Sequence, residues 1–184
     1  MNKYSKDTLE YWLKRYNTEE DLYNNTGVEE ELREKFQRTG YMTLDDLKKI
    51  VEWKFQALPG RKKRVFNLLT DTDNEYVQEV SKTAFKISDD KTRLLQLCTI
   101  KGVGPALASV ILAFFDPNRY GVFDIHSFRE IFEIRQKDTP KDLFTSPKYV
   151  LGFFRELRKL STEVEMSCRD VEKALFKKNL EESK

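Results

Sequence analysis

The sequence predicts an all-α fold on three observations. Apolar side chains recur at the three- and four-residue spacing of amphipathic helices along most of the chain. Signals that begin or end helices separate these segments: Thr43 and Asp46 have the spacing of a capping box, and Gly40 follows one segment as a C-cap residue does. We find no pair of alternating segments that is typical of a β-hairpin. The predicted helices cover Ser5–Tyr16, Glu19–Asn24, Val28–Thr39, Leu44–Ala57, Arg61–Leu69, Asn74–Phe85, Asp89–Cys98, Pro105–Phe115, Ile125–Ile134, Pro147–Leu160 and Cys168–Lys178.

Length and composition indicate an ordered globular chain. With 184 residues, 39% of them hydrophobic and 12% aromatic, the chain is long enough for one sizeable core or for two small subdomains that share an interface. We therefore treat residues 1–184 as a single all-α chain. The 33 basic and 31 acidic residues leave a net charge of +2, which neither requires nor excludes a polyanionic partner. Attraction to such a partner would have to come from a local basic patch.

The few cysteine and histidine side chains argue against a structural metal site. Cys98, Cys168 and His126 are the only residues of their types, and they cannot form a four-ligand cysteine zinc site or a four-cysteine iron–sulfur cluster. We therefore expect no metal and no cofactor. The sequence shows neither a cleavable secretory signal nor an apolar run long enough to span a membrane. We expect an intracellular protein without a membrane partner.

A glycine hairpin, Gly102-Val103-Gly104, separates two apolar helical segments. Two glycines around one apolar residue allow a tight turn with positive φ and leave backbone N–H groups uncovered. Pro105 then suits the first turn of the next helix, because its fixed φ is already helical. The first N–H groups of that helix have no partner within the helix and lie at the positive end of its dipole, so they can receive a phosphate. Such a contact holds a nucleic-acid backbone without reading its sequence.

Asp124 has two interpretations. Turn-forming residues at 116–121 return the chain from the apolar helix toward Asp124, which directly precedes the predicted helix Ile125–Ile134. An aspartate at this place is a preferred N-cap whatever the function. The same carboxylate could also do chemistry in a cleft. The helix N-terminus favours its ionised form, and burial in an apolar pocket would oppose it.

Two segments together resemble the hallmark motifs of the helix-hairpin-helix superfamily of base-excision DNA glycosylases. They are Ile100-Lys101-Gly102-Val103-Gly104 and Val122-Phe123-Asp124-Ile125-His126-Ser127-Phe128-Arg129. Asp124 lies 20 residues after Gly104, which matches the arrangement in that family. The resemblance covers residues 97–131, a helix-hairpin-helix followed by a catalytic-aspartate segment. It implies an all-α fold with two helical subdomains and a cleft between them.

The resemblance implies a monomeric DNA repair enzyme that acts on double-stranded DNA and hydrolyses the N-glycosidic bond of a damaged or mispaired base. Asp124 would be the catalytic residue, because a fixed carboxylate can stabilise positive charge on the sugar and orient or deprotonate water. Six residues of the hairpin would hold the DNA: Lys101, Gly102, Val103, Gly104, Pro105 and Ala106.

This chain departs from the family pattern in three ways. Bifunctional members carry a lysine where this chain has Ala106, so the resemblance implies a monofunctional enzyme, unless another lysine such as Lys54 reaches the site. The iron–sulfur cysteines of some members are absent, although the resemblance leaves room for a monovalent cation at the hairpin. Phe123 replaces a smaller residue usual before the aspartate, which alters the expected shape of the base pocket.

Outside the matching segments, two further groups of residues are candidates for DNA contacts. A basic run could contact phosphates, although short basic runs are usually a solvated helix face; it consists of Arg61, Lys62, Lys63 and Arg64. Four side chains could line a base pocket: Tyr41, Trp53, Lys54 and His126. Core packing is the simpler explanation of Trp53, which continues the apolar stripe of its helix, and a structural hydrogen bond is the simpler role of His126.

Two alternatives to catalysis remain open on the sequence alone. The hairpin could grip a DNA backbone in a non-catalytic binding protein, in which Asp124 is only a helix cap. It could instead pack helices together or contact a protein partner.

Overall fold

The computed structural model describes residues 4–18 and 26–182. In this part of the chain all regular structure is helical, which confirms the all-α prediction, and the predicted helix Glu19–Asn24 lies outside the described residues. The elements are α1 (Lys6–Thr18), α2 (Thr26–Thr39), α3 (Leu44–Lys54), α4 (Pro59–Leu69), α5 (Asn74–Lys86), α6 (Asp90–Leu97), α7 (Pro105–Phe115), α8 (Ile125–Phe132), the 3-10 helix η1 (Gln136–Asp138), α9 (Pro147–Val164) and α10 (Cys168–Glu182).

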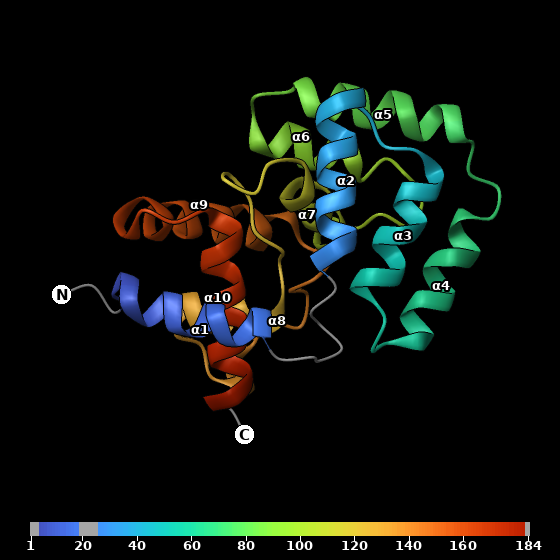
Figure 1. The fold of residues 1–184 in the computed structure, drawn as a ribbon. Coiled ribbons are helices and arrows are strands. Elements are labelled where there is room, and N and C mark those ends of the chain that lie inside the picture. The colour runs from blue at the N-terminus through green and yellow to red at the C-terminus, as the bar shows by residue number, and fades with distance from the viewer. Residues whose placement is uncertain (1–3, 19–25, 183–184) are drawn as a thin grey trace.

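The helices form two groups (Figure 1). In one group α10 packs against α1, α8 and α9, so that the first described helix and the last lie side by side. In the other group α7 packs against α2, α3 and α6, while α4 lies on α3 and α5 on α6. The two groups are joined where α9 contacts α6 and α7. Residues distant in sequence are thereby brought to one junction.

Helix α7 is the centre of the larger group. Nine of its eleven residues are buried, and its apolar stripe of Leu107, Val110, Ile111 and Phe114 lies in the core. Small residues such as Ala108 let neighbouring helices approach closely. The structure therefore places this helix at the centre of its group.

Turn residues set several helix ends, and some of these ends differ from the sequence prediction. Thr43 and Asp46 do form a capping box at the start of α3. Helix α3 ends at Lys54 rather than at Ala57, because its C-cap residue Phe55 leaves the helical conformation, with φ −113° and ψ 21°. Pro59 itself is the first residue of α4, two residues earlier than predicted. Helices α9 and α10 each run four residues beyond the predicted ends.

Ion pairs at Asp90 hold α6 against α9. The Asp90 carboxylate accepts hydrogen bonds from the Tyr120 hydroxyl at 2.7 Å, Arg158 at 2.6 Å and Arg119 at 2.9 Å. Since these residues come from α6, α9 and the segment between α7 and α8, the network fixes the junction between the two groups of helices.

Candidate active site

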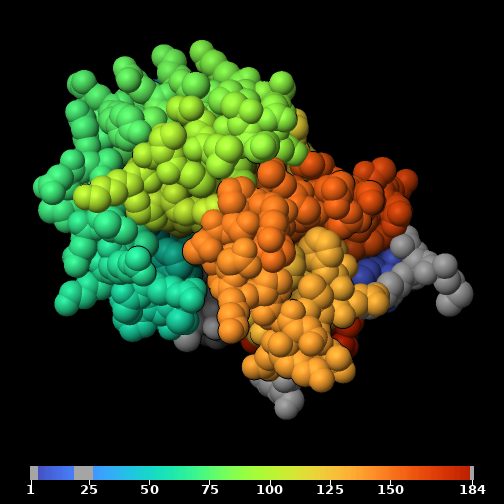
Figure 2. Space-filling model, turned by 180° about the vertical axis from the view of Figure 1, so that it is seen from behind, coloured from blue at the N-terminus to red at the C-terminus, as the bar shows by residue number. Residues whose placement is uncertain are grey.

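A cavity of about 740 Å³ lies at the junction of the two groups of helices. Its lining comes from α3, α4, the glycine hairpin, the residues around Asp124 and helix α10. Seen from behind, α4 in teal lies across a hollow from the orange segment before α9, to which the cavity-lining residues Phe144 and Thr145 belong (Figure 2). The hairpin residues Lys101–Gly104 and Asp124 therefore border one and the same cavity.

The first hairpin glycine is required by the backbone. Gly102 has φ +89°, a conformation that side chains with a Cβ rarely adopt. A Cβ at this position would also lie 3.2 Å from the Cβ of Leu68 on α4. The turn is closed by the N–H of Val103, which donates to the carbonyl of Ile100 at 2.9 Å.

The second hairpin glycine is not required by the protein itself. Gly104 is the N-cap of α7 with φ −89° and ψ 174°, which any residue can adopt, so the expected positive φ applies to Gly102 alone. A Cβ at Gly104 would meet nothing within 4 Å. No side chain caps the first turn of α7, and Pro105 is buried at its first position. Pro105 has no N–H, and the Ala108 N–H donates to the Gly104 carbonyl at 2.9 Å. The uncapped N–H groups of the turn therefore belong to Ala106 and Leu107, which both line the cavity.

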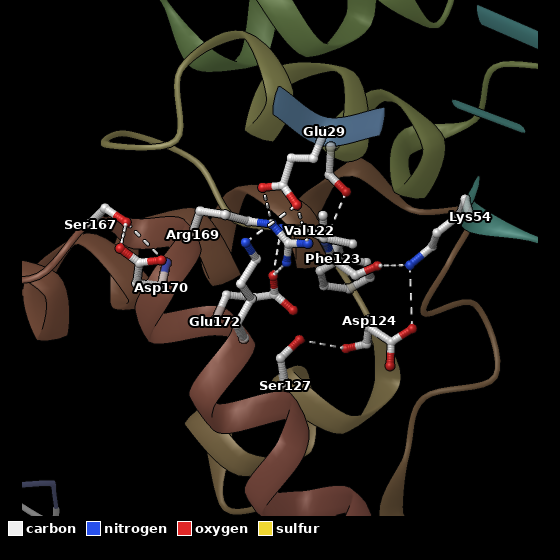
Figure 3. A network of polar contacts seen from close by, with 12 residues as sticks. Glu29, Lys54, Val122, Phe123, Asp124, Ser127, Ser167, Arg169, Asp170 and Glu172 are labelled. Atoms are coloured by element: carbon white, nitrogen blue, oxygen red, sulfur yellow. Dashed lines mark hydrogen bonds and ion pairs between the residues drawn. The ribbon is translucent and has the colours of Figure 1, made fainter. Parts of the chain in front are cut away.

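Asp124 is both a helix cap and a cavity residue. Its Oδ1 accepts a hydrogen bond from the His126 N–H at 3.1 Å and so caps α8. Its Oδ2 lies 3.3 Å from Nζ of Lys54, and its side chain keeps 23% of its surface exposed (Figure 3). Burial by itself would raise the pKa of Asp124, but Lys54 and the His126 N–H stabilise the carboxylate and lower this pKa overall. Asp124 is therefore ionised at neutral pH.

Lys54 reaches the site from the end of α3. Its ammonium donates to the carbonyl of Phe123 at 3.2 Å as well as to Asp124, and its side chain is only 12% exposed. These two contacts fix both the backbone and the carboxylate at the start of α8. The sequence identified Lys54 as a pocket residue, but it did not predict that Lys54 would pair with Asp124.

The other predicted pocket residues have different positions. Trp53 lines the cavity and also packs edge-on against Phe114, so its predicted core role and its pocket role hold together. His126 lines the cavity, and its Nδ1 lies 3.0 Å from the side-chain oxygen of Asn179, as a structural histidine would. Tyr41 does not line the cavity, because it lies in the connection between α2 and α3.

The basic run at the start of α4 divides into two pairs. Arg61 and Arg64 line the cavity. Lys62 forms an ion pair with Glu52 at 2.8 Å, and Lys63 is exposed outside the cavity lining. A helix presents successive residues about 100° apart, so a run of four cations cannot face one partner. The sequence located the run but could not tell which members face the cavity.

Two charged residues of α10 belong to the site and were not identified from the sequence. Arg169 and Glu172 line the cavity, and both are almost completely buried. Glu172 accepts a hydrogen bond from Arg169 and another, at 3.2 Å, from the N–H of Val122 (Figure 3). Arg169 also pairs with Glu29 of α2 at 2.8 Å. This pairing connects elements far apart in the chain, which no local pattern indicates.

Neither metal-ligating side chains nor comparisons with known proteins indicate the function. Within residues 4–18 and 26–182, no group of three or more His, Cys, Asp or Glu side chains could hold a metal ion. No helix in the described ranges combines the length and apolar character needed to cross a membrane. Comparisons with protein-family models, curated proteins and solved structures give no match for this chain. The function must therefore be argued from the geometry of the cavity.

Proposed function

We propose that this protein is a DNA N-glycosylase of the helix-hairpin-helix type that removes a damaged or mispaired base from double-stranded DNA. One observation carries the proposal: the glycine hairpin and the ionised Asp124 border the same cavity. In this proposal the two groups of helices are two subdomains, and the cavity is the cleft between them. A volume of about 740 Å³ exceeds what one nucleobase occupies, and it falls in the range of ligand-binding pockets.

The hairpin would hold the DNA backbone. The N–H groups in the first turn of α7 point outward at the positive end of the helix dipole, and a phosphate can accept hydrogen bonds from them. The absence of a Cβ at Gly104 lets the phosphate approach the backbone closely. Arg61 and Arg64, which line the same cavity, add positive charge beside this position. The strand would therefore be gripped next to the site of chemistry.

Asp124 would stabilise the transition state. When the bond between a base and its sugar breaks, positive charge develops on the sugar, and a fixed carboxylate beside it lowers the barrier. Lys54 and the cap bond from the His126 N–H hold the Asp124 carboxylate in place, so little reorganisation is needed. The same carboxylate can accept a proton from the attacking water. Ala106, which stands at the lysine position of bifunctional enzymes, has no amine to attack the sugar.

The alternative is a non-catalytic DNA-binding protein. The cap bond from the His126 N–H to Asp124 would account for an aspartate at this place without any chemistry. The two functions differ in a single measurement, since a binding protein retains DNA affinity but releases no base.

The decisive experiment is release of free base from duplexes that carry uracil, thymine mismatches, oxidised purines or alkylated bases. Asp124→Asn should abolish release and leave duplex binding largely intact, because asparagine is an equally good N-cap. Asp73→Asn is the matched control: Asp73 caps α5 in the same way, through a bond of 2.8 Å from the Glu75 N–H, outside the cavity. The control should keep full activity. Absence of release from every duplex, or full activity of Asp124→Asn, would refute the proposed function.

A further inference from the structure

A second carboxylate, Glu172, faces the cavity with one oxygen. Its side chain is 2% exposed, and its Oε2 accepts the hydrogen bonds from Arg169 and the Val122 N–H. Its other oxygen, Oε1, has no hydrogen-bond partner among the described residues. Figure 3 shows one oxygen of Glu172 against the Arg169 guanidinium and the other pointing away from it. Because Glu172 lines the cavity, Oε1 is available to a bound ligand.

The position of Glu172 is fixed by close packing. At Gly121 a Cβ would lie 2.8 Å from the Cβ of Glu172 and 2.5 Å from a methyl carbon of Leu157, so only a glycine lets α10 approach this segment. The Val122 N–H then holds the carboxylate from the same segment, two residues before Asp124. Glu172 is therefore held at a fixed distance from Asp124, as a preorganised group must be.

Burial makes Glu172 the carboxylate of its network with a raised pKa. Arg169 is shared by two carboxylates, Glu172 and Glu29. Burial would raise the pKa of Glu29, but Arg169 and Lys173, which lies 3.4 Å away, lower it overall. Burial raises the pKa of Glu172, Arg169 and Lys54 offset this rise only in part, and the negative charge of Asp124 adds to it. Two carboxylates with opposite pKa shifts thus face one cavity, an arrangement typical of an acid and base pair.

We propose that Glu172 is the general acid of this site and protonates the base as it leaves. This inference rests on the proposed glycosylase function. The proton on Oε1 moves to a ring nitrogen of the base while the bond from C1′ to the base breaks and its electron pair goes to the base. Water then adds to C1′ and gives its proton to Asp124, Asp124 releases this proton to solvent, and solvent returns a proton to Glu172. The base, the sugar hydroxyl and both carboxyl groups are then in balance.

This role predicts the class of substrate. A neutral purine departs as a poor leaving group unless a ring nitrogen is protonated, and general acid catalysis of this kind contributes about 10²–10⁴-fold. A purine that is already cationic, such as 7-methylguanine, gains nothing from an acid. The site would therefore favour neutral damaged or mispaired purines.

The test compares Glu172→Gln with Glu29→Gln in single-turnover excision. Both variants remove one carboxylate from Arg169, but Glu29 does not line the cavity, so it is a matched control for stability. The neutral substrates are duplexes with hypoxanthine, 8-oxoguanine or mispaired adenine, and the cationic substrate is a duplex with 7-methylguanine. Glu172→Gln should lower the rate on neutral purines at least about 100-fold and leave the rate on 7-methylguanine within about threefold. Glu29→Gln leaves the charge of Arg169 to Glu172 alone, so it should lower the pH at which the ratio of the two rates falls and leave the ratio unchanged below that pH.

If Glu172→Gln lowered the excision rate equally on neutral and cationic purines, the role of Glu172 as general acid would be refuted. The same role would be refuted if the wild-type protein released 7-methylguanine or uracil but no neutral purine. Release of no base at all would instead refute the proposed function. The wild-type protein gives an independent readout should Glu172→Gln fail to fold. Its rate on neutral purines, relative to 7-methylguanine, should fall as pH rises and Glu172 loses its proton. A ratio that falls at no pH at which the protein stays folded would contradict the proposal.

Discussion

Gly104→Ala should leave the stability of the protein nearly unchanged and weaken its binding to DNA. The backbone at Gly104 has φ −89° and ψ 174°, and a Cβ there meets nothing within 4 Å, so alanine fits without strain. Replacing glycine at a compatible position stabilises a protein by about 0.4–1 kcal/mol, because the unfolded chain loses conformational freedom. Alanine is a poorer N-cap than glycine and costs a similar amount at this position, so the Tm should stay within about 2 °C of the wild-type value.

The same methyl group would stand between the hairpin backbone and a phosphate. A hydrogen bond to a charged group contributes about 1.5–3 kcal/mol, so losing one raises the Kd for duplex DNA at least about tenfold. Gly102→Ala provides the contrast. With φ +89° and Leu68 at 3.2 Å from the new Cβ, it should cost about 1–3 kcal/mol of stability and lower Tm by several degrees.

Thermal unfolding and duplex binding at low salt, measured on both variants, separate folding from recognition. The expected pattern is a nearly unchanged Tm with weaker binding for Gly104→Ala and a lower Tm for Gly102→Ala. If Gly104→Ala kept wild-type affinity, the hairpin would not approach a phosphate closely, and its use as a DNA grip would be refuted. If its Tm fell as far as that of Gly102→Ala, the open space found at Gly104 would itself be wrong.

Three further predictions concern the charges of the protein. Lys54→Met removes the cation that offsets the burial of Asp124, so the pKa of Asp124 should rise. The pH below which the excision rate falls should then move upward, and an unchanged pH profile would contradict the pairing of Lys54 with Asp124. Arg64→Gln should reduce the salt dependence of DNA binding by about 0.9 in the log–log slope, whereas Lys82→Gln, on the exposed surface of α5, should not. Asp90→Asn should cost about 2 kcal/mol near neutral pH in urea unfolding. Burial would raise the pKa of Asp90, but a tyrosine hydroxyl and two arginines lower it, so its stabilisation is present above the ordinary aspartate pKa and disappears as pH falls through the lowered value. A difference that persisted in acid would contradict this account.

The sequence predicts the helices well because each one buries an apolar stripe with a local period. Helix α7 shows this most clearly, since its stripe could be read from the chain and is buried in the core. Helix ends are less predictable, because they depend on single residues such as Pro59 and on contacts beyond the helix. The burial of Arg169 and Glu172 likewise depends on contacts beyond their own helix, so the sequence does not predict it. A charged residue in a helical pattern is usually exposed, and the burial of Arg169 is made tolerable by its ion pairs with Glu172 and with the distant Glu29.

The interval between the hairpin and Asp124 has a geometric cause. The eleven residues of α7 carry the chain about 16 Å away from the hairpin at 1.5 Å per residue. The eight residue-to-residue steps from Asp116 to Asp124 can span at most about 26 Å when extended, which is enough for the chain to return along the helix. The return is observed directly: the N–H of Phe123 donates to the hydroxyl of Ser109 at 2.9 Å, beside the first turns of α7. An interval of 20 residues is therefore one helix outward and one extended segment back, which brings a carboxylate to the helix end that can hold a phosphate. Sequence spacing limits how far Asp124 can lie from the hairpin, whereas no such constraint links Asp124 to α10.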